Sequence, residues 1–296
     1  MTDTAAETLV TSSATRLRLP THWLGVAPFF IFALMFLILP TLYLVVGAFQ
    51  NNAGEWTLEN IYNLFQPSIL AAYWISIRIS LASAVLGALV GLAIAIAIVR
   101  GGLPNWVRSA TLTFSGVASN FAGVPLAFAF LATLGRLGLV TILLREIGVN
   151  IYALGFNILS FSGLTLTYLF FQIPLMVVII TPAIDGLKRE WGEAAATLGA
   201  TTWQYWRMVV IPVLWPSFLG TVILLFANAF GAIATAYALT GSSLNIVPIL
   251  LYAQIRGDVL HNPHLGYALA FGMIVVTGLA NVFYIWFRTR SERWLK

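Results

Sequence analysis

Few side chains in this sequence are suited to chemistry, because only 8% of its 296 residues are charged and none is cysteine. A chain without cysteine has no thiolate metal site and no cysteine nucleophile. A phosphate-binding loop needs Gly-Lys followed by Ser or Thr, but Lys188 and Lys296 each follow a leucine. We therefore expect the chain to be no enzyme, to hold no cofactor of its own and to bind no nucleotide through such a loop.

The histidines are the remaining candidates for metal ligands. His261 and His264 are close in sequence and could share an ion, but only Asp258 lies nearby as a third ligand. His22 stands far away, at the start of an apolar stretch. The sequence therefore favours a solvated loop at 258–264 and predicts no metal site.

Uncharged polar residues inside long apolar stretches form a second group of candidates. Polar side chains within a membrane face other helices or a water-filled path, because contact with lipid would cost free energy. Thr221, Asn228 and Thr235 recur every seven residues, which places them on one face of a continuous helix. The candidate pathway residues are Asn120, Tyr168, Gln172, Asn228 and Thr235. The alternative is that these side chains form hydrogen bonds between helices.

The segment 185–212 has the most informative local pattern. Residues 187–198 favour a helix, and the run Ala194-Ala195-Ala196 gives it a face of small side chains. Gly199 is expected to end this helix, and Thr201 with Gln204 forms a capping-box pattern for a second helix that carries Trp203. Pro212 marks the junction with the next apolar stretch. Two short helices at an angle should form a projecting foot.

The elements that position these residues are membrane spans. With 60% hydrophobic residues, the chain cannot cover a water-facing surface, which excludes a soluble enzyme and a nucleic-acid-binding module. A helix needs about 20 apolar residues to cross a bilayer. We predict an all-α integral membrane fold with six transmembrane helices in a permease domain of residues 23–296, preceded by an N-terminal arm at 1–22. The predicted spans are Trp23–Ala48, Tyr73–Val99, Ala110–Leu131, Ser160–Ala183, Val213–Leu239 and Leu265–Phe287.

The distribution of Lys and Arg predicts the orientation of these spans. One side of the membrane holds Arg16, Arg18, Arg100, Arg108, Lys188, Arg189, Arg207, Arg288, Arg290, Arg293 and Lys296. The opposite loops hold only Arg136, Arg145 and Arg256, while Arg78 falls just inside the second span. By the positive-inside rule, both termini and the segment 185–212 should be cytoplasmic. The apolar parts of the outer loops 132–159 and 240–264 favour short helices at the membrane surface or packed over the bundle.

The segment 185–212 also resembles a known motif. Glu193-Ala194-Ala195, Gly199 and Val209-x-Ile211-Pro212 are similar to the EAA motif, E-A-A-x-x-x-G-x9-I-x-L-P, of bacterial ABC importer permeases. Val209 and Ile211 replace the usual Ile and Leu, which are conservative changes. The resemblance extends over about 70–290, and the chain is similar to the type I permeases of the spermidine/putrescine branch.

This resemblance implies a bacterial inner-membrane subunit that couples to ATP hydrolysis by another protein. The foot would act as the coupling helix that docks into an ABC ATPase dimer, through Glu193, Ala194, Ala195, Gly199, Trp203 and Pro212. A second permease chain would complete the solute pathway, and a periplasmic or extracellular solute-binding protein would deliver the solute. The lipid bilayer is the remaining partner, and no nucleic acid is expected.

The substrate is less well defined by the sequence. The branch resemblance favours a polyamine such as spermidine or putrescine, yet the predicted spans contain no Asp or Glu to attract a polycation. A neutral or anionic solute, such as an opine, a phosphonate or sulfate, is therefore the alternative. A stand-alone secondary carrier or channel is the other functional class, although coupled carriers usually keep ionisable groups within their spans.

Overall fold

The computed structural model of the chain describes residues 22–256 and 262–291. Residues 1–21 of the predicted N-terminal arm lie outside the described residues, and so does His261. Contacts between residues divide the chain into two compact units, Met1–Leu44 and Val45–Lys296.

The first long helical stretch begins in the first unit and ends just inside the second. It consists of α1 (His22–Ala33), a π-helical turn η1 (Leu34–Ile38) and α2 (Leu39–Ala48). Within it, Gly25–Ala48 is long and apolar enough to cross a membrane, which confirms the first predicted span.

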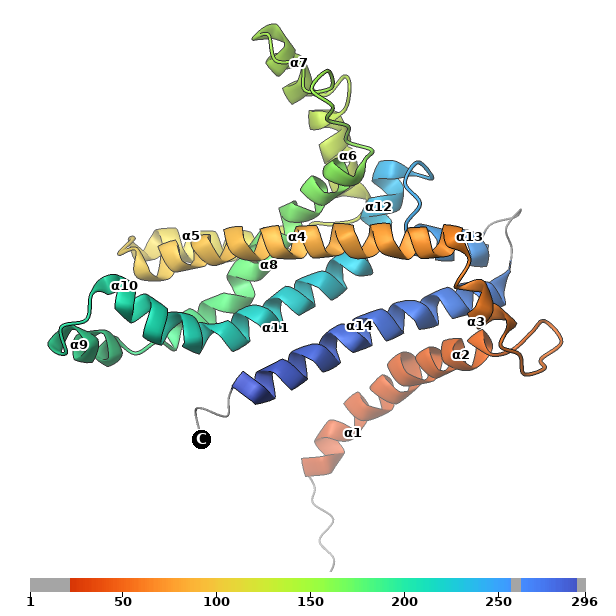
Figure 1. Cartoon of the computed structure of the whole chain (residues 1–296), viewed down its shortest axis with the longest axis horizontal. Helices are drawn as coiled ribbons and strands as arrows, with labels where there is room; N and C mark the ends of the chain where they lie inside the picture. The colour runs from red at the N-terminus through yellow and green to blue at the C-terminus, as the bar shows by residue number, and fades with distance from the viewer. Residues whose placement is uncertain (1–21, 257–261, 292–296) are drawn as a thin grey trace, which may run out of the picture. The chain divides into compact units, whose positions relative to one another are not determined.

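The described part of the second unit is mainly helical, with turns between its helices and one isolated β-bridge between Gln50 and Trp56. Its helices after α2 are α3 (Glu59–Asn63), α4 (Pro67–Arg100), α5 (Asn105–Ala118), α6 (Val124–Leu134), α7 (Leu139–Glu146), α8 (Phe161–Asp185), α9 (Arg189–Thr197), α10 (Thr202–Tyr205), the π-helical turn η2 (Trp206–Val210), α11 (Ile211–Phe230), α12 (Ile233–Thr240), α13 (Val247–Arg256) and α14 (Pro263–Ser291). Figure 1 shows α5, α9 and α10 near the C-terminal end of α4, and α13 near its N-terminal end. We call the end of the molecule near the C-terminal end of α4, where α9 and α10 lie, the foot end.

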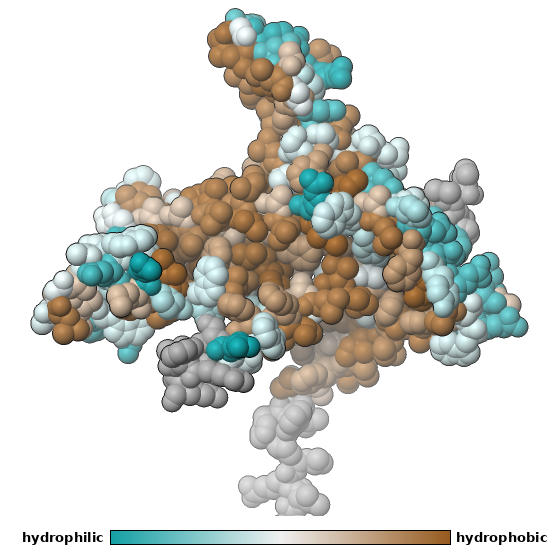
Figure 2. Space-filling view, viewed as in Figure 1, coloured by the Kyte–Doolittle hydropathy of each residue, from teal (hydrophilic) through white to brown (hydrophobic). Residues whose placement is uncertain are grey.

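Membrane-spanning character is confirmed for six segments of the described chain. After the first, they are Pro67–Arg100, Val124–Glu146, Phe161–Asp185, Thr202–Phe230 and Pro263–Arg290. Figure 2 shows hydrophobic side chains over α4 and α11 and more hydrophilic ones over α9 at the foot. Short helices form in both predicted outer loops, α13 within 240–264 and α7 within 132–159, although α7 also belongs to the apolar segment Val124–Glu146.

One face of α4 is a stripe of small buried residues against which α8 packs closely. A Cβ atom at Gly87 would lie 2.8 Å from the Gln172 Cβ, and one at Gly91 would lie 2.6 Å from the Met176 Cβ. Helix association in lipid depends on close packing of this kind, so the Gly87-x-x-x-Gly91 pair fixes the approach of α4 to α8. The stripe continues through Ser80, Ser83, Ala84, Ala88 and Ala95.

The third predicted span, Ala110–Leu131, is not one continuous helix. It is interrupted between α5 and α6, where Gly123 has φ of +78°, a conformation that favours glycine. Pro125 follows in the first turn of α6, where its missing N–H is tolerated but where an interior position would break a helix. The membrane-spanning segment here is Val124–Glu146, which includes α7.

The fifth predicted span, Val213–Leu239, is interrupted as well. α11 ends at Phe230, and Ile233 N donates to Gly231 O at 2.8 Å. With φ −77° and ψ 72°, Ala232 is the central residue of an inverse γ-turn. The prediction that Thr221, Asn228 and Thr235 share one helical face is therefore wrong for Thr235, which lies on α12.

Candidate functional site

The foot is built from α9 and α10, and its turn is capped as the sequence predicted. Gly199 has φ of +76°, and its N–H donates to Ala196 O at 2.9 Å. Ala200 N donates to Ala195 O at 3.0 Å, which completes a Schellman motif at the end of α9. No heavy atom beyond the neighbouring residues lies within 4 Å of the position of a Cβ on Gly199. The glycine is thus required by the backbone conformation and not by lack of space.

The second helix of the foot begins with the predicted capping box. Gln204 N donates to the Thr201 hydroxyl at 3.3 Å, and Thr201 N donates to the Gln204 side-chain oxygen at 2.7 Å. Tyr205 packs against Gly192, because a Cβ there would lie 3.7 Å from the Tyr205 ring. The two short helices are therefore held at a defined angle.

The outer surface of the foot is apolar at its tip. The side chain of Leu198 is 88% exposed and that of Trp203 is 68% exposed. The motif residues Glu193, Ala194 and Pro212 are also exposed, while Ala195 is half-buried. Exposed apolar side chains on a polar projection are typical of an interaction surface. Leu198 is not among the candidate residues of the sequence, although its place directly before a cap glycine was a signal.

The foot is tied to the spans by two cationic side chains. The Arg108 guanidinium on α5 pairs with the Asp185 carboxylate at the end of α8, at 2.6 Å. The Arg100 guanidinium at the end of α4 donates to Leu187 O at 2.6 Å, two residues before α9 begins. These contacts connect α4, α5 and α8 to the segment that enters the foot.

A cavity of about 290 Å³ lies where the two interrupted spans meet. Its polar lining includes Ser119, Asn228 and Thr235, and no charged residue lines it. The Gly123 N–H donates to the Thr235 hydroxyl at 2.7 Å, so the two breaks are joined directly. Residues of the first turn of α12 also line the cavity.

The predicted pathway residues divide into two groups. Asn228 is exposed and lines the cavity, and Thr235 lines it while remaining 2% exposed. Asn120 is exposed in the break between α5 and α6, where its amide donates to Gly116 O at 2.9 Å.

Tyr168 and Gln172 belong to the second group, on the interior face of α8. The Tyr168 hydroxyl donates to Ala232 O at 2.8 Å, and the Gln172 amide donates to Leu225 O at 2.8 Å. For these two residues the alternative role is therefore confirmed: they form hydrogen bonds within the helix bundle and do not line the cavity between the interrupted spans. The Gln172 side-chain oxygen is buried and has no hydrogen-bond partner in the described chain.

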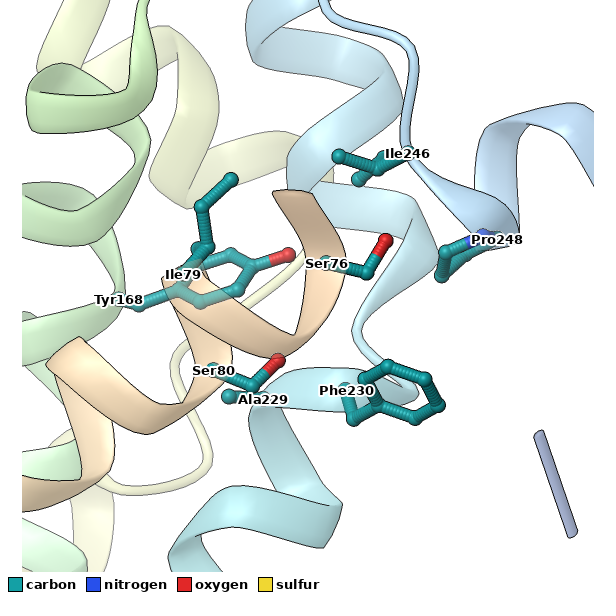
Figure 3. A pocket seen from close by; sticks show the side chains of 8 residues that line it. All are labelled: Ser76, Ile79, Ser80, Tyr168, Ala229, Phe230, Ile246 and Pro248. Carbon is teal, nitrogen blue, oxygen red and sulfur yellow. The ribbon is translucent and has the colours of Figure 1, made fainter. Parts of the chain in front are cut away.

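The Tyr168 hydroxyl, Ser76 and Ser80 also meet at a cavity of about 10 Å³ (Figure 3). This volume is at the lower limit for one water molecule. Ser76 donates to Ala72 O at 2.8 Å and accepts from Val247 N at 2.9 Å. The site is therefore a closed contact between α4, α8 and the start of α13, and it is too small to be a passage for solute.

Replacing Tyr168 with phenylalanine is expected to destabilise the protein by about 1 kcal/mol, because the γ-turn carbonyl of Ala232 loses its buried donor. Tyr152→Phe is the matched control, since the Tyr152 hydroxyl donates to Leu134 O at 2.8 Å beside a half-exposed outer loop. Thermal unfolding of the purified chains in detergent measures both. Equal losses for the two variants would contradict a special role for the Tyr168 bond.

Solved structures share this fold. A bacterial ABC transporter involved in the import of the acidic polysaccharide alginate matches with a TM-score of 0.71 and 18% identity, covering 91% of this chain and 95% of that one. The MetNI methionine ABC transporter matches with a TM-score of 0.54 and 14% identity, over 76% of this chain and 96% of that one. The fold is therefore that of an ABC importer transmembrane domain.

Sequence comparison gives the family. Residues 87–296 match the family described as binding-protein-dependent transport system inner membrane component, and this chain belongs to it. The molybdenum transport system permease protein ModB of Mycobacterium tuberculosis is 28% identical over 218 residues, 72% of this chain and 77% of its own length. The sulfate transport system permease protein CysW of Escherichia coli is 26% identical over 227 residues, 77% of this chain and 70% of its own length. The chain is a transport component of an ABC importer in the inner membrane.

Proposed function

We propose that this chain, with a second permease chain, forms the membrane pathway of an importer for a tetrahedral oxyanion such as sulfate or molybdate. The cavity between the two interrupted spans carries this proposal, because it offers uncharged polar groups where solute must pass. The names of the molybdenum and sulfate relatives support the same substrate class.

The chemistry of this cavity suits a small anion. Asn228 supplies a hydrogen-bond donor, and the cavity is bordered by Gly123 at the N-cap of α6 and by the first turn of α12. N-terminal N–H groups of helices and the helix dipole attract negative charge. Since no Lys or Arg lines the cavity, an anion would be held weakly enough to leave again.

A polyamine, which the sequence resemblance favoured, fits this cavity less well. A polycation would be stabilised by carboxylates, and neither Asp nor Glu lines the cavity. Helix N-termini would also repel a cation. Sulfate, one of the anionic alternatives raised by the sequence, therefore becomes the favoured class.

We further propose that the foot docks onto an ABC ATPase dimer on the cytoplasmic side, while a solute-binding protein delivers the anion from outside. The exposed Leu198 and Trp203 and the motif residue Glu193 support this docking. The family description itself includes dependence on a binding protein. The excess of basic residues at the foot end supports a cytoplasmic location for this end.

Replacing Asn228 with leucine is expected to reduce oxyanion uptake about tenfold or more, because a hydrogen bond to a charged group contributes about 1.5–3 kcal/mol. The measurement is uptake of radiolabelled sulfate, molybdate and spermidine by cells that express the chain with its co-purifying ATPase and binding protein. Asn281→Leu is the control, since Asn281 is exposed on α14 and does not line the cavity.

Three results would count against the proposal in different ways. Uptake of spermidine alone would show that the oxyanion class is wrong while the importer remains. Transport by the purified chain without any ATPase would favour the carrier or channel alternative. Normal sulfate and molybdate uptake by Asn228→Leu would show that this cavity is not the pathway.

A further inference from the structure

A second, larger hollow lies at the foot end, away from the cavity between the interrupted spans. It is a cleft of about 430 Å³ at the point where α4 ends, α8 ends and α9 begins. Its lining includes Val99 and Ile184, which belong to the last turns of two membrane spans. The cleft therefore lies at the level where the hydrocarbon core of the bilayer gives way to the lipid headgroups.

The polar lining of this cleft is positively charged overall. Four cationic side chains line it against two acidic ones. The cations are Arg100, Arg108, Lys188 and Arg189, and the acids are Asp185 and Glu190. The Asp185 carboxylate is already paired with Arg108. In the described chain, neither Lys188 nor Arg189 has an ion pair or side-chain hydrogen bond, although both are exposed to the cleft.

The helix beside the cleft points to a lipid as the kind of anion that would suit these cationic side chains. α5 directs Arg108 into the cleft, while Trp106, two residues earlier, is 73% exposed. Two residues on a helix are separated by about 200°, so these side chains lie on opposite faces. Phe114 and Val117 extend the exposed apolar face that begins at Trp106. Tryptophan is enriched at the headgroup level of membranes, and an apolar face of this kind lies in the interface.

We propose that this cleft binds the phosphodiester headgroup of an anionic phospholipid, with its acyl chains against the half-buried Val99 at the end of α4. Lys188 and Arg189 would contact the phosphate oxygens, since basic pockets between span ends suit such headgroups. A lipid held here would contact the start of the foot and the ends of α4 and α8 together. The site is independent of the solute pathway, so it stands whichever solute the importer carries.

Binding of phosphatidylglycerol to the purified full chain in neutral detergent, followed by native mass spectrometry, tests this site. We expect preference for phosphatidylglycerol over phosphatidylcholine, and a loss of affinity of about fivefold for each of Lys188→Gln and Arg189→Gln. Arg207→Gln removes an exposed charge from the same end of the chain but outside the cleft, and it should leave the affinity unchanged.

A variant that binds phosphatidylglycerol more tightly provides a further test, because misfolding would weaken binding and not strengthen it. Glu190→Gln removes an acid from the rim and should tighten phosphatidylglycerol binding several-fold. Equal binding of the two lipids, or equal effects of Lys188→Gln and Arg207→Gln, would overturn the proposal. Displacement of the lipid by millimolar inorganic phosphate would also overturn it, because the cleft would then be a site for a soluble anion.

Discussion

Replacement of Gly199 with valine is expected to abolish uptake while the chain still inserts into the membrane. The Schellman motif at the end of α9 requires φ of +76°, which a β-branched residue resists. A residue with a Cβ loses about 1–2 kcal/mol in this conformation. Since a Cβ at this position would meet no other atom, the effect must come from the backbone. The angle between α9 and α10 should change, and Leu198 should lose its position at the tip.

Gly199→Asn is the matched control, because asparagine tolerates the left-handed conformation better than other residues with a side chain. It should retain much of the uptake that valine removes. The measurements are solute uptake and co-purification of the ATPase at equal expression. If valine at this position keeps normal uptake, the foot is not the coupling element.

Glu193→Ala tests the same surface through its side chain. Truncation of an anchor residue at an interface commonly costs about 2 kcal/mol or more, so co-purification of the ATPase should fall together with uptake. Thr197→Ala is the control, since Thr197 is also exposed, one turn later on α9, and lies outside both the motif and the cleft. Identical behaviour of the two variants would remove the special role of Glu193.

Replacement of Gly91 with leucine is expected to have the largest effect on stability. A Cβ there would lie 2.6 Å from the Met176 Cβ and 2.7 Å from Ile173 O. The second contact is with backbone, so it cannot be relieved by a change of rotamer. Overpacking of a core costs about 1–3 kcal/mol, and separation of α4 from α8 would disturb the most extensive helix contact of the described chain.

Gly278→Leu provides the comparison for this substitution. Gly278 lies within the last span, and a Cβ there would have no neighbour within 4 Å beyond its own helix turn. The measurement is the yield of monodisperse protein in detergent and its thermal unfolding. Equal yields and equal unfolding temperatures for both variants would contradict close packing at Gly91.

The sequence alone determined the features that depend on neighbouring residues along the chain. Apolar length indicated that there are six spans, although not the bounds of the third and the fifth, because a helix satisfies its backbone hydrogen bonds in lipid from its own residues. Gly199 and the Thr201–Gln204 capping box fixed the foot for the same reason, since their hydrogen bonds join residues at most five apart. The motif in this segment then led to the family that sequence comparison confirms.

Only the tertiary structure decided where the spans break and which polar groups meet. Hydropathy averaged over a span does not register a single turn, and the break at Gly231 is held by the Tyr168 hydroxyl, 64 residues away. The Gly123 N–H likewise finds its acceptor on Thr235, 112 residues later. A polar residue type shows that a hydrogen bond is needed, but its partner is set by helix packing, which brings distant residues together. For that reason the sequence did not distinguish residues that line the cavity from residues that join helices. The structure shows the first role for Asn228 and Thr235 and the second for Tyr168 and Gln172.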